Sequence, residues 1–486
     1  MKKTALLLIL LVALGIRLYS IGSPAIGVHQ WRQSQTAMIA ENFYENGYRF
    51  FYPQINWAGG ADGYAETDFP VYSFVVAVGY HFLGDHDWVG RLFSVFFSLA
   101  TIVFLYLLVR KHIDERTALW SSFFFAVLPL AAFYGRAIMP ETLMLMSTVG
   151  GIYFFSEWLT KKSPVYVVLS FILIADACLL KPTSLYVGLP LLYLAIEKEG
   201  AGALKRPAIW VYAVLTVAVV FAWYYHAHNI LMETGQTIGL YDKFANWGLL
   251  LKAKFWNRIV AQSLMERHFA WVGFPVFLVG LFLRREKKGE RLFDFWLLAV
   301  VVYMLVAGQG NFVHDYYQLV FMLPGVVFVG KVFARHFDFN RIGKEKKSAL
   351  LAFALVGTVV FSFVRLHRSI KQENTEESAT YKISRVVKEK TSGKDLIVTV
   401  TDGDPAVLYF SHRKGWVLPT YLVEEEYLDG LVKEGALYLV GLYWRFDQPD
   451  EKDKLERLFA SKKYKMVYND KSAFIMRLKE QGRERP

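Results

Sequence analysis

The chain has 486 residues, of which 54% are hydrophobic, 16% aromatic and only 20% charged, and its formal net charge is +12. A soluble protein of this length does not bury so much apolar surface, so the composition excludes an ordinary water-soluble enzyme and predicts a multi-pass membrane protein. The basic residues stand mostly in short loops between apolar segments. That pattern is the positive-inside bias, which explains the charge and leaves no nucleic-acid partner to be invoked.

The chain begins with two lysines and an apolar run, MKKTALLLILLVALGIRLYSIG. Arg17 and Tyr19 end this run, and no convincing small-residue cleavage site precedes Ser23, so we expect an uncleaved membrane anchor. Cys178 is the only cysteine and lies within another apolar run. An intramolecular disulfide is therefore excluded, and Cys178 is expected to be a small buried residue.

Apolar segments long enough to span a bilayer recur along the first three quarters of the chain. A span needs about 20 apolar residues, and on that rule we predict about eleven transmembrane helices. The hairpin around Lys181-Pro182-Thr183 is expected to be broken or tilted. If the N-terminus is cytoplasmic, the basic loops all become cytoplasmic and the C-terminus lies outside. The predicted spans are 4–20, 90–109, 118–134, 141–159, 164–180, 184–197, 208–225, 270–284, 292–308, 315–334 and 347–365.

The segment 68–84, DFPVYSFVVAVGYHFLG, is apolar enough to resemble a span. A crossing here would turn every later basic loop outward, so we expect an interfacial helix on the outer side, with its tyrosines and His81 at the headgroup level. Residues 22–89 then form a long outer segment. Residues 226–269 form a second one, which also contains an interfacial helix.

After residue 368 the composition becomes charged and water-soluble. Helical and short apolar stretches alternate over 369–486, beginning with a helix near 375–391, and predict a small α/β domain. This domain has no glycine-rich phosphate fingerprint, and Asp402-Gly403-Asp404 is expected to be a turn rather than a metal site. The predicted fold class is an α-helical polytopic membrane domain, 1–368, with a soluble α/β domain, 369–486, outside the membrane.

Polar side chains gather in four groups that the predicted topology places on one outer face. Carboxylates, arginines, histidines and tyrosines at a lipid–water boundary suit a reaction with a phosphate leaving group and a hydroxyl or amine nucleophile. The groups are His29, Trp31 and Arg32 in HQWRQ, Glu66 and Asp68 in YAETDFPVY, Arg136 and Glu141 in YGRAIMPE, and His314, Asp315, Tyr316 and Tyr317 in NFVHDYYQL.

The order of these stretches resembles the GT-C superfamily of membrane glycosyltransferases, in the family 39 branch of aminoarabinose transferases and protein O-mannosyltransferases. The resemblance covers about residues 1 to 330 and is carried by PVYSFVVAVGYHFLG, GRLFSVFFSLATIVFLYLLVRK, FYGRAIMPETLML, LLKPTSLYVGLP and HDYYQLVFMLPG. It implies a GT-C fold, a polyprenyl-phosphate sugar donor and chemistry on the extracytoplasmic face. It also implies that an acidic residue of the first outer loop activates the acceptor.

The resemblance leaves the general base open among four residues. Glu141, after GRAIMP, matches the family's acidic position at the start of the fourth span, and Glu66 or Asp68 matches the acidic position before a helix start. Where the family has an acid after its first helix, this chain has His29 in HQWRQ. His29 can take a proton near neutral pH or bind a divalent metal together with Glu66 or Asp68.

The donor phosphate needs a cation, and the family's lysine beside the helix start is replaced here by Asp68. Arg32 or Arg136 is expected to bind the phosphate instead, because the planar guanidinium engages phosphate oxygens bidentately. The alternative for Arg32 is a side chain that snorkels to lipid headgroups. Lys181 is open between a phosphate ligand and a snorkelling lysine.

The aromatic residues and Glu141 also have alternative roles. Trp31 either stacks on a sugar ring or anchors the chain at the interface. Glu141 either acts in catalysis or stabilises the start of a helix after Pro140. His314, Tyr316 and Tyr317 either bind the sugar or acceptor or form an aromatic belt with a helix cap.

The sequence thus predicts an inverting hexosyl- or pentosyltransferase of the inner (plasma) membrane. It would move a sugar from a polyprenyl-phosphate donor to a lipid, glycan or protein acceptor in the cell envelope, with its site and C-terminal domain extracytoplasmic. No cofactor is assigned, and a divalent metal stays open. One alternative is a flippase or transporter for a lipid-linked saccharide, which would place charges near mid-span, where Asp176 is the clear acid. The other is an oligosaccharide ligase that uses a polyprenyl diphosphate.

Overall fold

The computed structural model describes residues 2–239, 247–373, 378–461 and 463–479. The chain forms two compact units. Unit 1 comprises Met1–Ile21, Arg91–His226 and Gly239–Ile370, and unit 2 comprises Gly22–Gly90, Ala227–Ile238 and Lys371–Pro486. Unit 2 therefore joins the first outer segment to the C-terminal residues, whereas the sequence placed these in separate domains.

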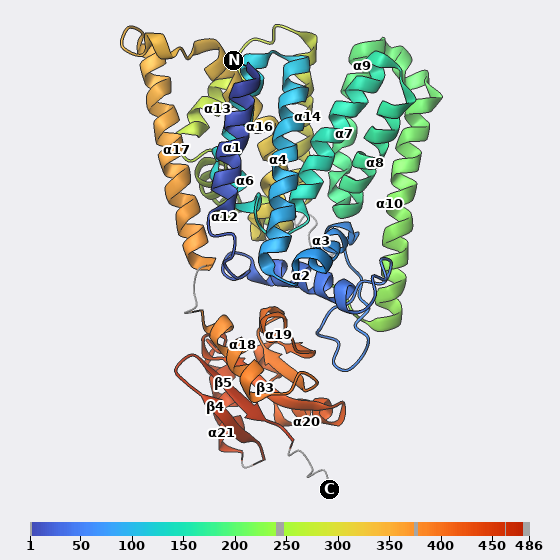
Figure 1. The fold of residues 1–486 in the computed structure, drawn as a ribbon, viewed down its shortest axis with the longest axis vertical. Helices are drawn as coiled ribbons and strands as arrows, with labels where there is room; N and C mark the ends of the chain where they lie inside the picture. The colour runs from blue at the N-terminus through green and yellow to red at the C-terminus, as the bar shows by residue number, and fades with distance from the viewer. Residues whose placement is uncertain (1, 240–246, 374–377, 462, 480–486) are drawn as a thin grey trace. The chain divides into compact units, whose positions relative to one another are not determined.

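Unit 1 is a helical bundle in which the long helices run roughly parallel (Figure 1). A helix occurs in each of the predicted apolar spans, so the helical part of the predicted fold class is confirmed. The main helices are α1 (Lys2–Leu18), α4 (Asp87–His112), α7 (Glu141–Lys161), α8 (Pro164–Leu180), α9 (Gly188–Glu199), α10 (Pro207–Thr234), α13 (Gly273–Phe282), α14 (Arg291–Val306), α16 (Leu319–His336) and α17 (Lys346–Glu373).

Membrane-spanning capacity is clear for only some of these helices. By length and composition, four stretches in the described part of the chain can cross a membrane: α4, α10, Asp315–His336 and α17. The pair Ala253–His268 and Gly273–Phe282, bent by 103°, adds a fifth if it is one span. Thr4–Leu18, Val71–Leu83 and Pro164–Leu180 are shorter apolar helices. The count of eleven spans and the topology drawn from it stay predictions.

The predicted continuous span 118–134 is in fact two helices. α5 (Glu115–Val127) ends just before Pro129, and α6 (Pro129–Tyr134) begins at that proline. Proline lacks an N–H and its ring clashes with the preceding turn, so a proline inside an apolar helix kinks or breaks it. The break leaves backbone carbonyl oxygens that need donors.

Arg17 of α1 supplies those donors. Its side chain is fully buried, and Nη1 donates to the carbonyl oxygen of Ala126 at 3.0 Å. Nη2 lies 3.5 Å from the carbonyl oxygen of Phe125, whose helical donor is missing because residue 129 is a proline. Further hydrogen bonds from Arg17 reach the carbonyl oxygen of Ala131 at 3.3 Å and Ser98 Oγ at 2.8 Å. From the sequence, Arg17 only marked the end of the first apolar run. In the structure, its guanidinium binds the backbone where α5 and α6 meet.

A second break falls where the sequence predicted it. α8 ends at Leu180, a 3-10 helix η1 (Pro182–Val187) follows, and α9 begins at Gly188. Lys181 is the extended residue between the two helices, with φ −148° and ψ 108°. The broken hairpin around Lys181-Pro182-Thr183 is therefore confirmed.

The first outer segment contains two helices of unit 2 that pack on each other, α2 (Gln30–Glu45) and α3 (Val71–Leu83). α3 matches the helix predicted over 68–84, and its place at a membrane surface stays a prediction. The second predicted outer segment, 226–269, contains the end of α10, α11 (Trp247–Leu250), α12 (Ala253–Trp256) and a π-helix η3 (Asn257–His268). Residues 240–246 of that segment lie outside the described residues.

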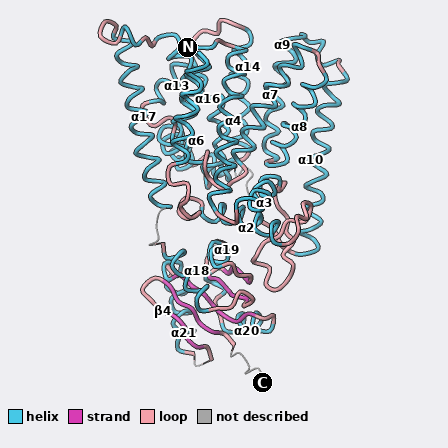
Figure 2. Tube along the Cα trace, in the orientation of Figure 1, coloured by secondary structure: helices cyan, strands magenta, loops and turns pink. Residues whose placement is uncertain are grey.

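The C-terminal part of unit 2 is a five-stranded sheet with strand order β2-β1-β3-β5-β4. β1 pairs in parallel with β2 and β3, and β5 pairs antiparallel with β3 and β4. The strands, magenta in Figure 2, are β1 (Leu396–Val400), β2 (Gly415–Leu418), β3 (Ala436–Leu442), β4 (Lys465–Asn469) and β5 (Ala473–Arg477). The helices are α18 (Ala379–Lys390), α19 (Ala406–Ser411), α20 (Glu425–Lys433) and α21 (Pro449–Ala460).

This arrangement confirms the predicted small α/β domain. Its core includes Val398 of β1, Leu439 of β3 and Phe474 of β5, all buried. Asp402 and Gly403 have positive φ values of 51° and 86°, which confirms the predicted turn. β2 and α19 were not predicted, and residues 375–377 of the predicted helix 375–391 lie outside the described residues.

Short elements complete the described chain. They are α15 (Gly308–Val313) and the 3-10 helices η2 (Gly200–Lys205), η4 (Lys288–Glu290), η5 (Asp315–Gln318), η6 (Phe339–Arg341), η7 (Thr420–Leu422) and η8 (Tyr443–Arg445). Of these, η5 matters for the site, because it opens the stretch that leads into α16.

The Arg17→Met variant should destabilise unit 1, because it removes the donors for the carbonyls at the α5–α6 break. Each buried acceptor left unsatisfied costs about 1–3 kcal/mol, so we expect a loss of about 3 kcal/mol or more. The measurement is the thermal unfolding midpoint of purified protein in detergent. Arg368→Met, which removes an exposed arginine of α17, is the matched control and should leave the midpoint unchanged. Equal midpoints for both variants would contradict this role of Arg17.

Candidate functional site

A buried ion pair in unit 1 joins two of the residues singled out from the sequence. Glu141 is the first residue of α7 and is 1% exposed. Lys181, in the break after α8, places Nζ 3.2 Å from Glu141 Oε1. The position of Glu141 at a helix N-terminus favours its negative charge. Glu141 can therefore stabilise the start of α7 and pair with Lys181 at the same time.

The aromatic residues predicted beside this pair lie against Lys181. Its Nζ is 5.5 Å from the ring centroid of Tyr316 and 5.0 Å from that of Tyr317. His314 stacks on Tyr316 with ring centroids 5.2 Å apart. The structure therefore brings five candidates from three separate stretches of sequence into one cluster, which we call the lysine cluster: Glu141, Lys181, His314, Tyr316 and Tyr317.

A second ion pair borders the lysine cluster through Asp315. This carboxylate accepts a hydrogen bond from Tyr134 Oη at 2.5 Å and is paired with Arg267 Nη1. The rings of Tyr134 and Tyr316 are 6.2 Å apart in an edge-on contact. Tyr134 and Arg267 were not singled out from the sequence. The sequence offered one signal for Tyr134, which is its place two residues before Arg136 in the stretch YGRAIMPE.

Arg136, a predicted phosphate ligand, is fully buried in unit 1. Its Nη2 donates to the carbonyl oxygen of Ser20 at 2.6 Å. One of its hydrogen bonds is thus spent on holding the end of the first apolar segment. A role in phosphate binding stays a prediction for this residue.

In unit 2, Arg32 and Asp68 form a direct ion pair, and both side chains are nearly buried. Arg32 lies in the first turn of α2, and Nη1 also faces Gln35 Oε1 at 3.4 Å. The two residues were predicted to act separately, as phosphate ligand and as base. The geometry makes them one neutral pair in which each holds the other in place.

Glu66 points toward different partners from Asp68. It is fully buried, and its Oε2 accepts a hydrogen bond from Thr237 Oγ1 at 2.7 Å. Its Oε1 lies 3.8 Å from His228 Nδ1. Backbone hydrogen bonds from Glu66 to Gln236 and from Ile238 to Glu66 reinforce this contact. Glu66 thus fastens the outer segment to residues 227–238 within unit 2.

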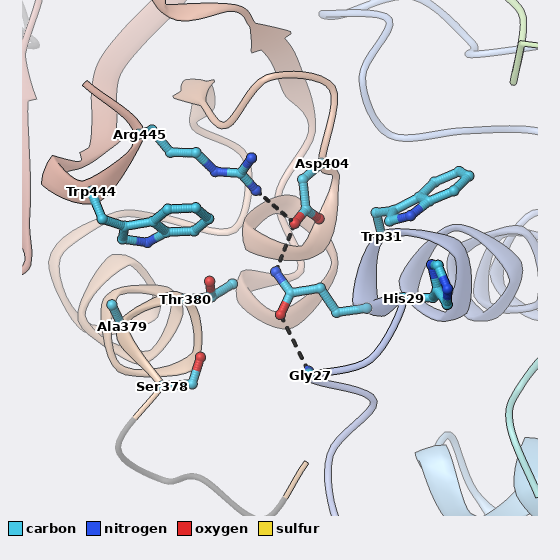
Figure 3. Close-up of a pocket in the computed structure, with 10 residues that line it drawn as sticks. Gly27, His29, Trp31, Ser378, Ala379, Thr380, Asp404, Trp444 and Arg445 are labelled. Carbon is cyan, nitrogen blue, oxygen red and sulfur yellow. Dashed lines mark hydrogen bonds and ion pairs between the residues drawn. The ribbon is translucent and has the colours of Figure 1, made fainter. Parts of the chain in front are cut away.

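His29 and Trp31 line a cavity of about 430 Å³ in unit 2 (Figure 3). Asp404 lies at its wall and accepts hydrogen bonds from Gln30 Nε2 at 2.6 Å and from Arg445 Nη2 at 3.2 Å. Burial raises the pKa of the Asp404 carboxyl, and the two donors oppose that shift.

Trp444 also lines this cavity, and the Arg445 guanidinium lies over its ring, 4.1 Å from the ring centroid. Aromatic faces with a few fixed polar groups suit a polar ring such as a sugar. Asp404, Trp444 and Arg445 were not predicted, since no local pattern links them to His29 and Trp31 more than 370 residues earlier.

Comparison with known proteins supports the fold. A family model described as dolichyl-phosphate-mannose-protein mannosyltransferase matches residues 67–226. Comparison with curated protein sequences gives no significant match. The structure of ArnT from Cupriavidus metallidurans bound to undecaprenyl phosphate is similar, with a TM-score of 0.68 at 14% identity over 97% of both chains.

Two further enzymes share the architecture. The oligosaccharyltransferase AglB from the archaeon Archaeoglobus fulgidus, solved with an inhibitory peptide and a dolichol-phosphate, gives a TM-score of 0.61 at 13% identity, covering 91% of this chain and 69% of that one. The mycobacterial arabinofuranosyltransferase AftD gives 0.55 at 12% identity, covering 98% and 41%. These likenesses confirm the GT-C fold that the sequence resemblance implied.

The Arg32–Asp68 pair yields a stability prediction. Asp68→Asn removes one partner of a nearly buried pair, which typically costs about 3–5 kcal/mol, and the double variant Arg32→Gln/Asp68→Asn should recover part of that loss. The measurement is a double-mutant cycle of unfolding midpoints. Asp429→Asn breaks the exposed Lys463–Asp429 pair of the same unit and should cost less than about 1 kcal/mol. Additive effects of the two single variants would show that the pair is not coupled.

Proposed function

We propose that this chain, which has the GT-C fold of membrane glycosyltransferases, transfers a sugar from a polyprenyl-phosphate carrier to an acceptor on the extracytoplasmic side of the membrane. The observation that carries the proposal is the lysine cluster. This cluster joins a buried carboxylate at the start of α7, a lysine just after the end of α8, and histidine and tyrosine rings just before α16.

The lysine cluster has the groups that the reaction needs. The acceptor hydroxyl or amine attacks the anomeric carbon of the donor, and its proton passes to a carboxylate acting as general base. The bond between the anomeric carbon and the phosphate oxygen breaks, and the electron pair leaves with the polyprenyl phosphate. One displacement inverts the configuration at that carbon.

We assign the base role to Glu141 and the phosphate role to Lys181. In the structure the two charges neutralise each other at 3.2 Å. A donor phosphate that binds the ammonium competes with Glu141 for it, so donor binding weakens the hold on the carboxylate. The cation then stabilises the leaving phosphate as its charge develops, in a site where burial strengthens the attraction.

The lipid carrier is supported by the relatives rather than by a group of this chain alone. ArnT was solved with undecaprenyl phosphate and AglB with a dolichol-phosphate, and the matching family model is named for a dolichyl-phosphate-mannose donor. All three names refer to polyprenyl monophosphates or their sugar esters. A monophosphate donor is therefore the first one to test.

Unit 2 has a cavity of its own, of about 430 Å³. It is lined by Trp31, His29, Trp444, Arg445 and Asp404, which suit a sugar ring or a polar chain, and we assign to it the binding of a carbohydrate. The acceptor class, whether lipid, glycan or protein, is to be identified by the transfer assay. We place the protein in the plasma membrane with this unit outside, in keeping with the positive-inside bias of the basic loops.

The test is transfer of radiolabelled sugar from a polyprenyl-monophosphate donor, with purified protein returned to membranes that contain the native acceptor. We expect transfer by the wild type and a loss of about 100-fold or more in Glu141→Gln and in Lys181→Met. The matched controls are Glu157→Gln, toward the opposite end of α7, and Lys162→Met. They make the same two substitutions outside the lysine cluster. Both controls should retain activity.

The outcomes separate the alternatives. Transfer from a diphosphate donor alone would favour the oligosaccharide ligase. Movement of a labelled lipid-linked sugar from one leaflet of the vesicle membrane to the other, without sugar transfer to an acceptor, would favour the flippase. If Glu141→Gln transfers sugar at the wild-type rate, Glu141 is not the base, and Asp68, Glu66 and His29 become the candidates.

A further inference from the structure

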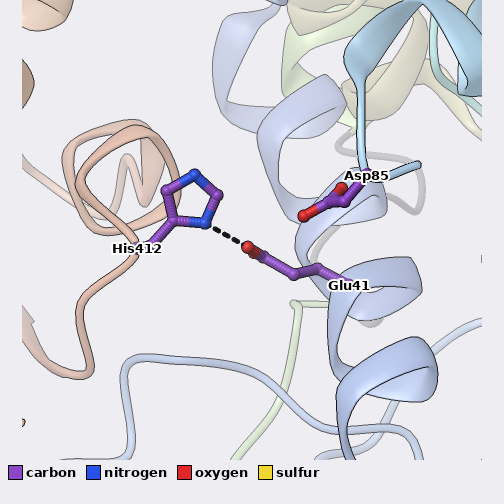
Figure 4. A group of neighbouring side chains, drawn as sticks. All are labelled: Glu41, Asp85 and His412. Carbon is purple, nitrogen blue, oxygen red and sulfur yellow. Dashed lines mark hydrogen bonds and ion pairs between the residues drawn. The ribbon is translucent and has the colours of Figure 1, made fainter. Parts of the chain in front are cut away.

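Three side chains of unit 2 converge at a place that the proposed reaction does not use. Glu41 comes from α2, Asp85 from the loop between α3 and α4, and His412 from the residue that ends α19 (Figure 4). One ligand atom from each lies within 4.8 Å of the other two. His412 adopts a left-handed backbone conformation, φ 49° and ψ 53°.

The carboxylate of Glu41 is the buried centre of this group. Glu41 is 3% exposed, and its Oε1 contacts His412 Nδ1 directly. Within the described part of the chain, Glu41 Oε2 is buried and has no hydrogen-bond partner. A buried carboxylate oxygen without a donor is costly, and a second carboxylate beside it raises that cost. Burial, with Glu41 next in effect, raises the pKa of Asp85 to about 7.

We infer that Glu41, Asp85 and His412 bind one divalent cation, with Zn²⁺ as the best match. Two carboxylate oxygens and one imidazole nitrogen form a donor set that zinc takes in proteins. Bonds of about 2.1 Å in a tetrahedral site separate ligand atoms by about 3.4 Å, so the present spacing needs only small side-chain movements. The cation would replace the direct contact between His412 and Glu41 and give Glu41 Oε2 a positive neighbour.

Three protein ligands leave a tetrahedral zinc with one open position. Asp85 and His412 also line a cavity of about 260 Å³, together with Lys388 and Tyr409. A water molecule or a further oxygen ligand can therefore reach the fourth position. The site is independent of the lysine cluster, which lies in unit 1, so its failure would leave the proposed transferase untouched.

The main consequence of this site is mechanical. It would tie α2 and the loop before α4 to α19 of the C-terminal sheet, three segments up to 371 residues apart. Because the ligand set does not exist in the unfolded chain, metal binding adds to the stability of this unit.

The experiment uses the full-length protein in detergent, stripped with a chelator. Zinc is titrated by calorimetry, and bound metal is counted by mass spectrometry after desalting. We expect one equivalent for the wild type, with an unfolding midpoint raised by zinc, and at least a 100-fold loss of affinity in His412→Ala and in Asp85→Asn. Glu41→Gln keeps the side chain's shape and should lose affinity as well.

His86→Ala is the matched control. His86 follows Asp85 and lines the same cavity but is not one of the three proposed ligands. The zinc affinity of the His86→Ala variant should therefore equal that of the wild type. Lack of zinc, manganese and magnesium binding by the stripped wild type would overturn the inference. Zinc binding that His412→Ala and Asp85→Asn leave unchanged would overturn it too, since the metal would then sit on other histidines.

Discussion

The helical unit depends on one constraint, that backbone carbonyls in apolar surroundings need donors. Pro129 breaks the segment 115–134, and Arg17 donates to the carbonyls of Phe125 and Ala126 at the break. With α6 held in this way, Tyr134 at its end reaches Asp315, and Asp315 stands at the start of the stretch that supplies Tyr316 and Tyr317. A buried arginine of α1 therefore helps to fix the direction of the short helix that carries Tyr134.

Pairing is the rule for the charges near the candidate sites. Glu141 pairs with Lys181, Asp315 with Arg267 and Asp68 with Arg32, each with little exposure to solvent. Such pairs stabilise a fold only modestly, because the desolvation of both ions offsets their attraction. Their value lies in keeping charged groups in fixed positions until an anionic substrate replaces one of the partners. In the proposed reaction, the donor phosphate would take the place of Glu141 beside Lys181.

The sequence predicted what depends on local pattern and missed what depends on distant contacts. Apolar length placed helices in every predicted span, and Lys181-Pro182 predicted its break, because hydropathy and proline act within a few residues. Pro129 carried the same signal, yet the apolar run around it read as one span. The resemblance pointed to Glu141, and the structure then joined it to Lys181. The group Glu41, Asp85 and His412 had no signal, since its members stand in unrelated local contexts.

The division into domains shows the same limit from the side of the sheet. β2 is an edge strand, and an exposed edge invites unwanted pairing. In unit 2 its Gly415 donates to the carbonyl of Asn56 at 2.9 Å and accepts from the N–H of Gly59 at 2.7 Å. Gly59 has φ +64°, and a Cβ there would lie 2.4 Å from the Trp416 ring, so only glycine fits. The outer segment therefore covers the edge of the sheet, and the soluble-looking C-terminal sequence is completed by residues from the other end of the chain.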